Sequence, residues 1–207
     1  MHTGKCSRSY ATLPALTVLL VFLCCSPRIS LLVDYLVPDT SNHLEGQQVC
    51  LEVKDVRADT HLFTATAIQD FDGFKDRYDL TLVTPNKARI SVGEKNLQGL
   101  FSEAIKKRLE SLGAVVTTTG RKDLPLFQVL IRDFKIDLQD RKWLSSASYE
   151  ANLSIDNQLV ARELVTGSAE RIKILGSKGA DTTLSDIFTE MINRLNIVKL
   201  FQQAKMV

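Results

Sequence analysis

The sequence has few of the side chains that enzymes commonly use to transfer protons or bind metals. Only three of its 207 residues are histidines, and two of them, His43 and His61, lie beyond the first 25 residues. A Gly-x-Ser-x-Gly nucleophile motif, zinc-ligand spacing and a dinucleotide fingerprint are all missing. We therefore expect a protein that is not an enzyme and that needs no metal and no cofactor.

An excess of charge of one sign is also missing. Lys5 and Arg8 are the only charged residues among the first 25, so residues 25–207 have a formal net charge of zero. Basic residues in this part of the chain alternate with acidic ones, which is typical of a solvated surface. A neutral domain lacks the electrostatic footprint of a nucleic-acid-binding protein, and we expect no nucleic-acid partner.

The chain has no apolar run long enough to cross a bilayer, which takes about 20 residues. Its longest such run, 13–23, follows Lys5 and Arg8 and stops at Cys24 and Cys25. This arrangement is typical of an export signal. Bacterial lipoproteins are cut just before a cysteine whose thiol carries diacylglycerol. Cleavage before Cys25 would leave the small Cys24 at the position held by the peptidase, whereas cleavage before Cys24 would leave the bulky Leu23 there.

We therefore predict a lipoprotein-type signal peptide at 1–24 and lipidation at Cys25. Ordinary secretion and an uncleaved N-terminal anchor are the alternatives. Of the four cysteines, only Cys25 and Cys50 would remain after cleavage. If Cys25 were not lipidated, a disulfide with Cys50 could form in an oxidising compartment.

The remainder of the chain predicts an extended tether at 25–47 and a single domain at 48–207. The tether is expected to lay Leu31, Val33 and Leu36 against the domain. Alternating or apolar runs predict strands at 48–57, 61–68, 78–83 and 114–118, and a three-strand meander at 126–138, 143–155 and 159–174.

Two amphipathic helices are expected. The first covers 97–112, with Asn96 as its N-cap and Gly113 after its end, and the second covers 184–201, with Thr183-Leu-Ser-Asp186 as a capping-box variant. The fold class is thus α+β, with an antiparallel or mixed sheet and both helices packed on one face.

Three motifs that suggest a binding site have simpler structural explanations. The segment 70–79 lacks the full ligand set of a calcium loop, and Asp72-Gly73 predicts a turn. The segment 176–179 lacks the spacing of a phosphate loop. Trp143 and Tyr149 lie on the apolar face of their strand, which favours a role in the core over an aromatic binding surface.

The order of these parts resembles the YajG family of bacterial lipoproteins. The resemblance rests on the leader, the tether sequence at 30–38, the strand ending in Asp55-Val-Arg57, the helix at 97–112, the meander and the terminal helix. It implies an envelope lipoprotein of poorly defined activity that faces the periplasm, with an α+β fold.

Three function classes follow. The first is a lipoprotein held to a membrane by Cys25, with a non-enzymatic domain that binds a protein or glycolipid partner. Ser26, with no Asp there, favours the outer membrane over the inner one. The second is an auxiliary lipoprotein of an ABC-type intermembrane lipid or solvent transport system, which predicts a lipid-sized apolar groove between a helix and the sheet. The third, an exported hydrolase, would need a cleft that brings Asp55, Asp70 and Asp72 to His61.

Overall fold

The structure, a computed structural model, describes residues 30–71, 74–118, 123–173 and 179–207. The larger sheet contains, in spatial order, β5 (Val115–Thr117), β2 (Gln48–Asp55), β6 (Leu126–Gln139), β7 (Lys142–Ile155) and β8 (Gln158–Ile172). The smaller sheet contains β1 (Leu31–Leu36), β3 (Tyr78–Val83) and β4 (Arg89–Lys95). The helices are α1 (Leu97–Ser111), α2 (Ala180–Arg194) and α3 (Ile197–Gln203).

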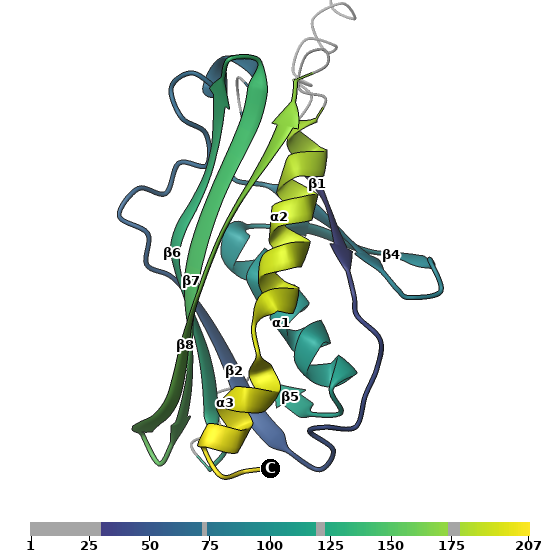
Figure 1. Ribbon diagram of the computed structural model, residues 1–207, viewed down its shortest axis with the longest axis vertical. Helices are drawn as coiled ribbons and strands as arrows, with labels where there is room; N and C mark the ends of the chain where they lie inside the picture. Colours follow the sequence, from purple (N-terminus) through teal and green to yellow (C-terminus); the bar gives the residue numbers. More distant parts are fainter. Residues whose placement is uncertain (1–29, 72–73, 119–122, 174–178) are drawn as a thin grey trace, which may run out of the picture.

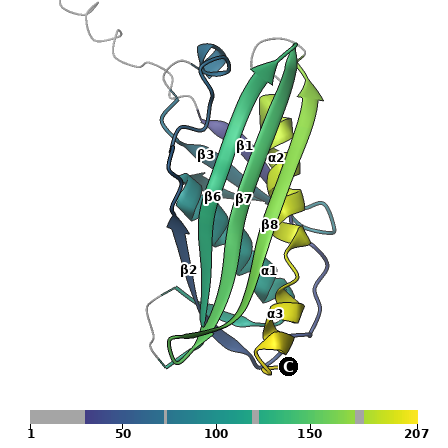
Figure 2. The ribbon, with the colours of Figure 1, turned by 60° about the vertical axis from the view of Figure 1, so that its left-hand side comes forward.

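The predicted α+β class is confirmed, although the chain forms two sheets. In the larger sheet β5, β2 and β6 pair in parallel, and β6, β7 and β8 pair antiparallel, so that sheet is mixed. Both long helices lie on the same side of β6, β7 and β8, and the smaller sheet lies on this side too (Figures 1 and 2).

The inner face of the larger sheet forms the core because its strands alternate apolar and polar residues. Trp143 and Tyr149 are fully buried there, as predicted. Phe101 of α1 makes edge-to-face contacts with Tyr149, with Phe134 of β6 and with Phe188 of α2, at centroid distances of 5.2 to 5.6 Å. Burying a side chain of this size contributes about 1.5–3 kcal/mol, so this aromatic cluster joins both helices to the sheet.

Helix α1 begins at Leu97, as predicted, and ends at Ser111, one residue before the predicted end, with Leu112 as its C-cap. The Asn96 side chain accepts a hydrogen bond of 2.8 Å from the backbone N–H of Gly99. Gly113 has φ +94°, a left-handed conformation that favours glycine. The backbone N–H of Ala114 returns to the carbonyl of Leu109, which satisfies a carbonyl at the helix end.

The single terminal helix predicted at 184–201 is wrong. The chain forms α2 and then α3, because Leu195 adopts a non-helical conformation (ψ 120°) and Asn196 caps α3 by accepting from the N–H of Lys199. The predicted capping box at residues 183–186 is also not formed. Thr183 lies inside α2, where its hydroxyl donates to the carbonyl of Gly179.

Two further strand predictions differ from the structure. Residues 61–68 form only a single bridge, Phe63 to Ile136, in the half of β6 that β2 leaves unpaired, because the chain turns directly after it and enters the 3-10 helix Ile68–Phe71. Strand β4 was not predicted, and its side chains are all exposed or half-buried, so it has no apolar alternation to detect.

Residues 31–36, within the predicted tether, form β1, which pairs in parallel with β3. Leu31 and Val33 are buried, but Leu36 is exposed, and Tyr35 is the third buried residue of the strand. The alternation of a strand places residues 31, 33 and 35 on one face, which explains why Leu36 points outward.

Candidate functional site

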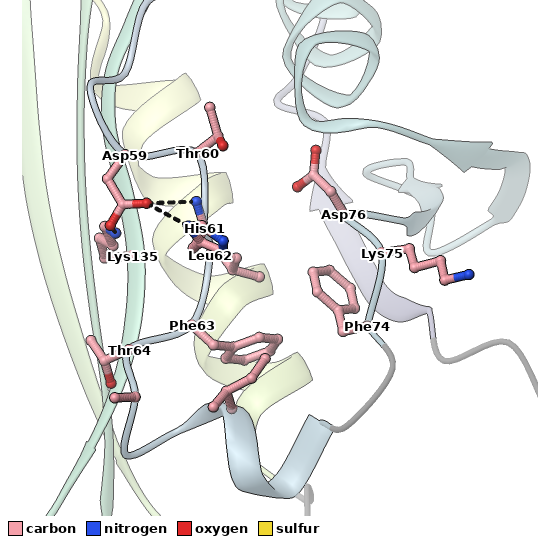
Figure 3. Close-up of a pocket in the computed structure, with 12 residues that line it drawn as sticks. Asp59, Thr60, His61, Leu62, Phe63, Thr64, Phe74, Lys75, Asp76 and Lys135 are labelled. Carbon is pink, nitrogen blue, oxygen red and sulfur yellow. Dashed lines mark hydrogen bonds and ion pairs between the residues drawn. The ribbon is translucent and has the colours of Figure 1, made fainter.

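A cavity of about 590 Å³ opens beside β6, between the segment at 59–65 and the segment at 74–76. Figure 3 shows Asp59, His61 and Lys135 on one side of it and Phe74, Lys75 and Asp76 on the other. Residues from β6, from a loop and from the segment before β3 therefore build the cavity together.

An ion pair at the end of β2 positions the loop that forms the first wall. The Arg57 guanidinium donates to both carboxylate oxygens of Asp55, at 2.9 and 2.7 Å, and also to the carbonyl of Phe134 at 3.3 Å. The carboxylate also accepts from the backbone N–H of Arg57 at 3.2 Å. The Asp55-Val-Arg57 motif thus turns the chain away from β2 and fastens it to β6.

Phe63 attaches the loop to β6 a second time and supplies the apolar wall. Its neighbours Leu62 and Thr64 share backbone hydrogen bonds of 2.7 and 3.0 Å with Ile136. The Phe63 ring stacks on Phe71 at 4.2 Å and meets Phe74 edge-on at 5.1 Å. Since Phe63 is held by backbone bonds and Phe71 by stacking, the aromatic wall is preformed.

Charged and polar groups line one rim. The Asp59 carboxylate accepts 3.0 and 2.8 Å bonds from the backbone N–H and Nδ1 of His61, and it pairs with Lys135. The Lys135 ammonium, followed by the two His61 bonds, lowers the pKa of Asp59 well below its usual range. Asp59 is therefore ionised at neutral pH, and the His61 ring is fixed beside it.

The opposite rim carries Lys75 and Asp76. Asp76 has a positive φ of 52° and accepts a 2.8 Å hydrogen bond from the Tyr78 hydroxyl. Burial, reinforced by the charge of Asp76, raises the pKa of Tyr78 well above its usual value, so Tyr78 remains a hydrogen-bond donor. Both rims contain one acidic and one basic side chain, and the aromatic wall lies between them.

Among the described residues, no threonine hydroxyl of the cavity lining is hydrogen-bonded to His61. Activation of a hydroxyl nucleophile would require that the hydroxyl be hydrogen-bonded to the base, here His61. The hydroxyls of Thr64 and Thr66 instead both donate to Asp137, which lowers the pKa of Asp137 to about 2. An apolar wall between two polar rims fits a ligand with both apolar and polar parts.

The hydrolase site considered from the sequence is not assembled among the described residues. Asp55 is bound to Arg57, and Asp70 is paired with Lys173, so neither reaches His61. The acidic partner of His61 is Asp59, which the sequence reasoning missed although its spacing of two residues from His61 was a usable signal. Asp72, the Asp72-Gly73 turn and most of the segment 176–179 lie outside the described residues.

The two cysteines of interest have different positions. Cys25, the predicted lipidation site, lies outside the described residues, whereas Cys50 is buried in β2 at 4% exposure. Within the described ranges, no group of three or more His, Cys, Asp or Glu side chains could hold a metal ion. In the same ranges, no helix has the length and apolar character needed to cross a membrane.

Comparison with solved structures shows that this chain shares the fold of a bacterial protein of known structure. Protein XCC0632 from Xanthomonas campestris, assigned to DUF330, aligns over 85% of this chain and 99% of its own, with 14% identity and a TM-score of 0.54. Rare lipoprotein B from Shewanella oneidensis covers 77% of this chain and 96% of its own at 6% identity, with a TM-score of 0.43. A minor lipoprotein from Acinetobacter baumannii covers 81% and 95% at 9% identity, with a TM-score of 0.39. No family model and no curated protein matches the sequence.

Proposed function

We propose that this protein is an exported lipoprotein of the bacterial envelope, anchored through Cys25, whose domain binds an amphipathic partner. The observation that carries the proposal is the position of Cys25. It ends an apolar leader of signal-peptide length and stands only six residues before β1 begins at Leu31. A lipid on Cys25 would therefore hold the folded domain close to a bilayer.

The chemistry of the anchor makes such attachment stable. A diacylglyceryl group on the thiol and an acyl group on the new N-terminus bury several chains, whereas a single chain binds only marginally. Ser26 directly after Cys25 favours the outer membrane, with the domain in the periplasm.

The cavity indicates the chemistry of the partner. Phe63 and Phe74 offer an apolar surface, and the rims with Asp59, Lys75 and Asp76 offer charges of both signs. A glycolipid, or an amphipathic protein segment, has the apolar and polar parts that such a cavity can contact. We expect a non-enzymatic role, and the hydroxyls of Thr64 and Thr66, which donate to Asp137 and not to His61, support it.

Intact mass of the membrane-extracted protein tests the proposal. The wild-type chain, expressed in a diderm host, should begin at residue 25 and carry added acyl mass. Cys25→Ala should lose both the acyl mass and the membrane retention. Cys24→Ala is the matched control, and it should be processed like the wild type because alanine is small enough for the peptidase pocket. An unmodified, soluble wild-type chain would refute the anchor.

The second candidate function is an auxiliary lipoprotein of an ABC-type transport system. The groove expected between a helix and the sheet is filled in the described structure by buried residues such as Leu184, Phe188 and Ile192. The cavity beside β6 could instead accept part of a lipid-like cargo. Retention of a transport ATPase complex by the wild-type protein, and its loss with Phe74→Asp, would favour this function over the first.

A further inference from the structure

One end of the domain gathers the start of β1, the start of α2 and the end of β8 (Figure 1). The backbone N–H of Leu32 donates to Asp181 at 3.1 Å. A Cβ built on Gly179, directly before α2, would lie 3.4 Å from the carbonyl oxygen of Ile172. The last residue of β8 is therefore next to the strand that follows Cys25.

The 3-10 turn at Ile68–Phe71 belongs to the same end. Its Asp70 pairs with Lys173, and the Phe71 ring meets Trp143 at 5.6 Å. Ile68 is thus brought to the end of the domain at which β7 begins and β8 finishes.

This end is within reach of the proposed anchor. Leu31 is the sixth residue after Cys25. Since an extended chain advances at most about 3.3–3.6 Å per residue, the lipidated sulfur could lie no more than about 20 Å from the start of β1. The tether therefore keeps this end of the domain closer to the anchor than the opposite end can be when the domain stands upright.

Two isoleucines are exposed at this end. Ile172 is 71% exposed and Ile68 is 41% exposed. The far end of β8 carries Leu159, which is also 57% exposed. The length of β8 places Leu159 about 45 Å from Ile172, so the two residues distinguish an upright domain from one that lies on its side.

Charge does not oppose contact with a neutral lipid surface. Three basic side chains at the start of β7 and the end of β8 are paired with acidic neighbours: Lys142–Glu170, Arg171–Asp186 and Lys173–Asp70. These pairs reduce the attraction of the three side chains to anionic headgroups, which leaves a contact through the apolar side chains to be tested by its salt dependence.

We propose that this end of the domain rests on the bilayer that holds the anchor, with Ile172 and Ile68 inserted at the headgroup boundary of zwitterionic lipid. The inference rests on the proposed lipidation of Cys25 and adds an orientation to it. The domain would stand upright on the membrane, with the β7–β8 turn directed away from the lipid.

A label at each end of β8 tests the orientation. Ile172→Cys and Leu159→Cys are made in the full lipidated chain, labelled with an environment-sensitive fluorophore and reconstituted into phosphatidylcholine vesicles. Cys50 is buried and should not take the label, which the wild-type chain checks. A quencher carried by the lipid headgroup region should reduce emission from residue 172 and leave emission from residue 159 unchanged. The effect should persist in about 1 M salt, where the Debye length is only about 3 Å.

The possible failures can be told apart. Wild-type protein that does not float with vesicles would refute the anchor itself. Protein that floats, but whose label at residue 172 is not quenched more than the label at residue 159, would refute the orientation alone. Quenching that disappears in high salt would also refute insertion, because it would show an electrostatic contact.

Discussion

The Asp55–Arg57 pair makes a sharp prediction because its two charges are unequally buried. The Arg57 side chain is 1% exposed, whereas the Asp55 side chain is 22% exposed. Asp55→Asn would leave a buried guanidinium without the carboxylate that is bound to it, and only the more distant charge of Asp76 would remain. Arg57→Met would leave a carboxylate that water can still reach. The first substitution should therefore be the more harmful.

Removal of one partner from a buried pair costs about 3–5 kcal/mol. We expect about 3 kcal/mol for Asp55→Asn, the lower end of that range, because asparagine keeps one acceptor oxygen. Arg57→Met loses the ion pair and leaves the Phe134 carbonyl without this donor, and an unmade hydrogen bond of that kind costs about 1–3 kcal/mol. The double variant should cost no more than Arg57→Met, because it leaves no uncompensated charge.

The effect should also depend on pH. Burial alone would raise the pKa of Asp55, but hydrogen bonds from the Arg57 side chain and backbone outweigh it and lower that pKa. A lowered folded-state pKa contributes stability above the unfolded pKa of about 3.9, and this stability is lost as the pH falls through the folded value. The wild type and Asp55→Asn should therefore approach each other in stability below about pH 4.

Urea unfolding followed by circular dichroism measures these differences. Glu52→Gln on the same strand is the control, since its pair with Lys54 is exposed and should contribute at most about 1 kcal/mol. Equal costs for the two single variants, or additive costs in the double variant, would contradict the account of the pair.

Four further substitutions, of which Thr182→Ala is a control, use the same unfolding assay. Glu150→Gln should cost about 1–2 kcal/mol at pH 7, less than a fully buried pair, because the two arginines beside Glu150 are half exposed. Burial alone would raise the pKa of Glu150, but Asn152 and the two arginines outweigh burial and lower that pKa. The cost of Glu150→Gln should therefore become smaller as the pH falls through this lowered pKa. Ser185→Ala should cost about 1 kcal/mol by removing the acceptor for the N–H of Asp34. Thr182→Ala on the exposed side of α2 should cost less than about 0.5 kcal/mol. Gly113→Ala should cost about 1 kcal/mol or more, because its φ is positive and an added Cβ would approach Glu45 at 3.2 Å; an unchanged midpoint would show that the turn relaxes.

Much of the fold could be predicted because periodicity reports burial. The strands of the larger sheet alternate, and the inward residues Trp143 and Tyr149 are fully buried. Helix α1 carries its cap signals in the sequence, and both Asn96 and Gly113 act as expected. Local pattern and tertiary packing agree in these elements, which is why sequence reasoning succeeds.

The cavity could not be predicted in this way. Its loop is placed by the Arg57 bond to Phe134 and by the bridge from Phe63 to Ile136, which join residues more than 70 positions apart. The pairing of Asp59 with Lys135 is equally distant in sequence. Apolar residues at 61–68 suggested a strand, but after the single bridge at Phe63 the chain turns and forms a 3-10 helix.

The polar face of α2 shows most clearly why a local pattern can mislead. Asp181, Ser185, Thr189 and Asn193 recur at every fourth residue, which is the spacing of a solvated helix face. Three of their side chains instead accept from the backbone N–H groups of β1, at 3.0 to 3.2 Å, and Asn193 donates to the carbonyl of Leu36.

One edge of β1 pairs with β3, and the other edge would leave its backbone groups unpaired. Because α2 supplies side-chain partners along that edge, a strand from the N-terminal part of the chain is fixed to a helix about 150 residues later. The same polar face therefore ties the segment that follows Cys25 to the core. A pull on the proposed anchor would be resisted both by the β1–β3 ladder and by α2, so the domain should follow its lipid as one body.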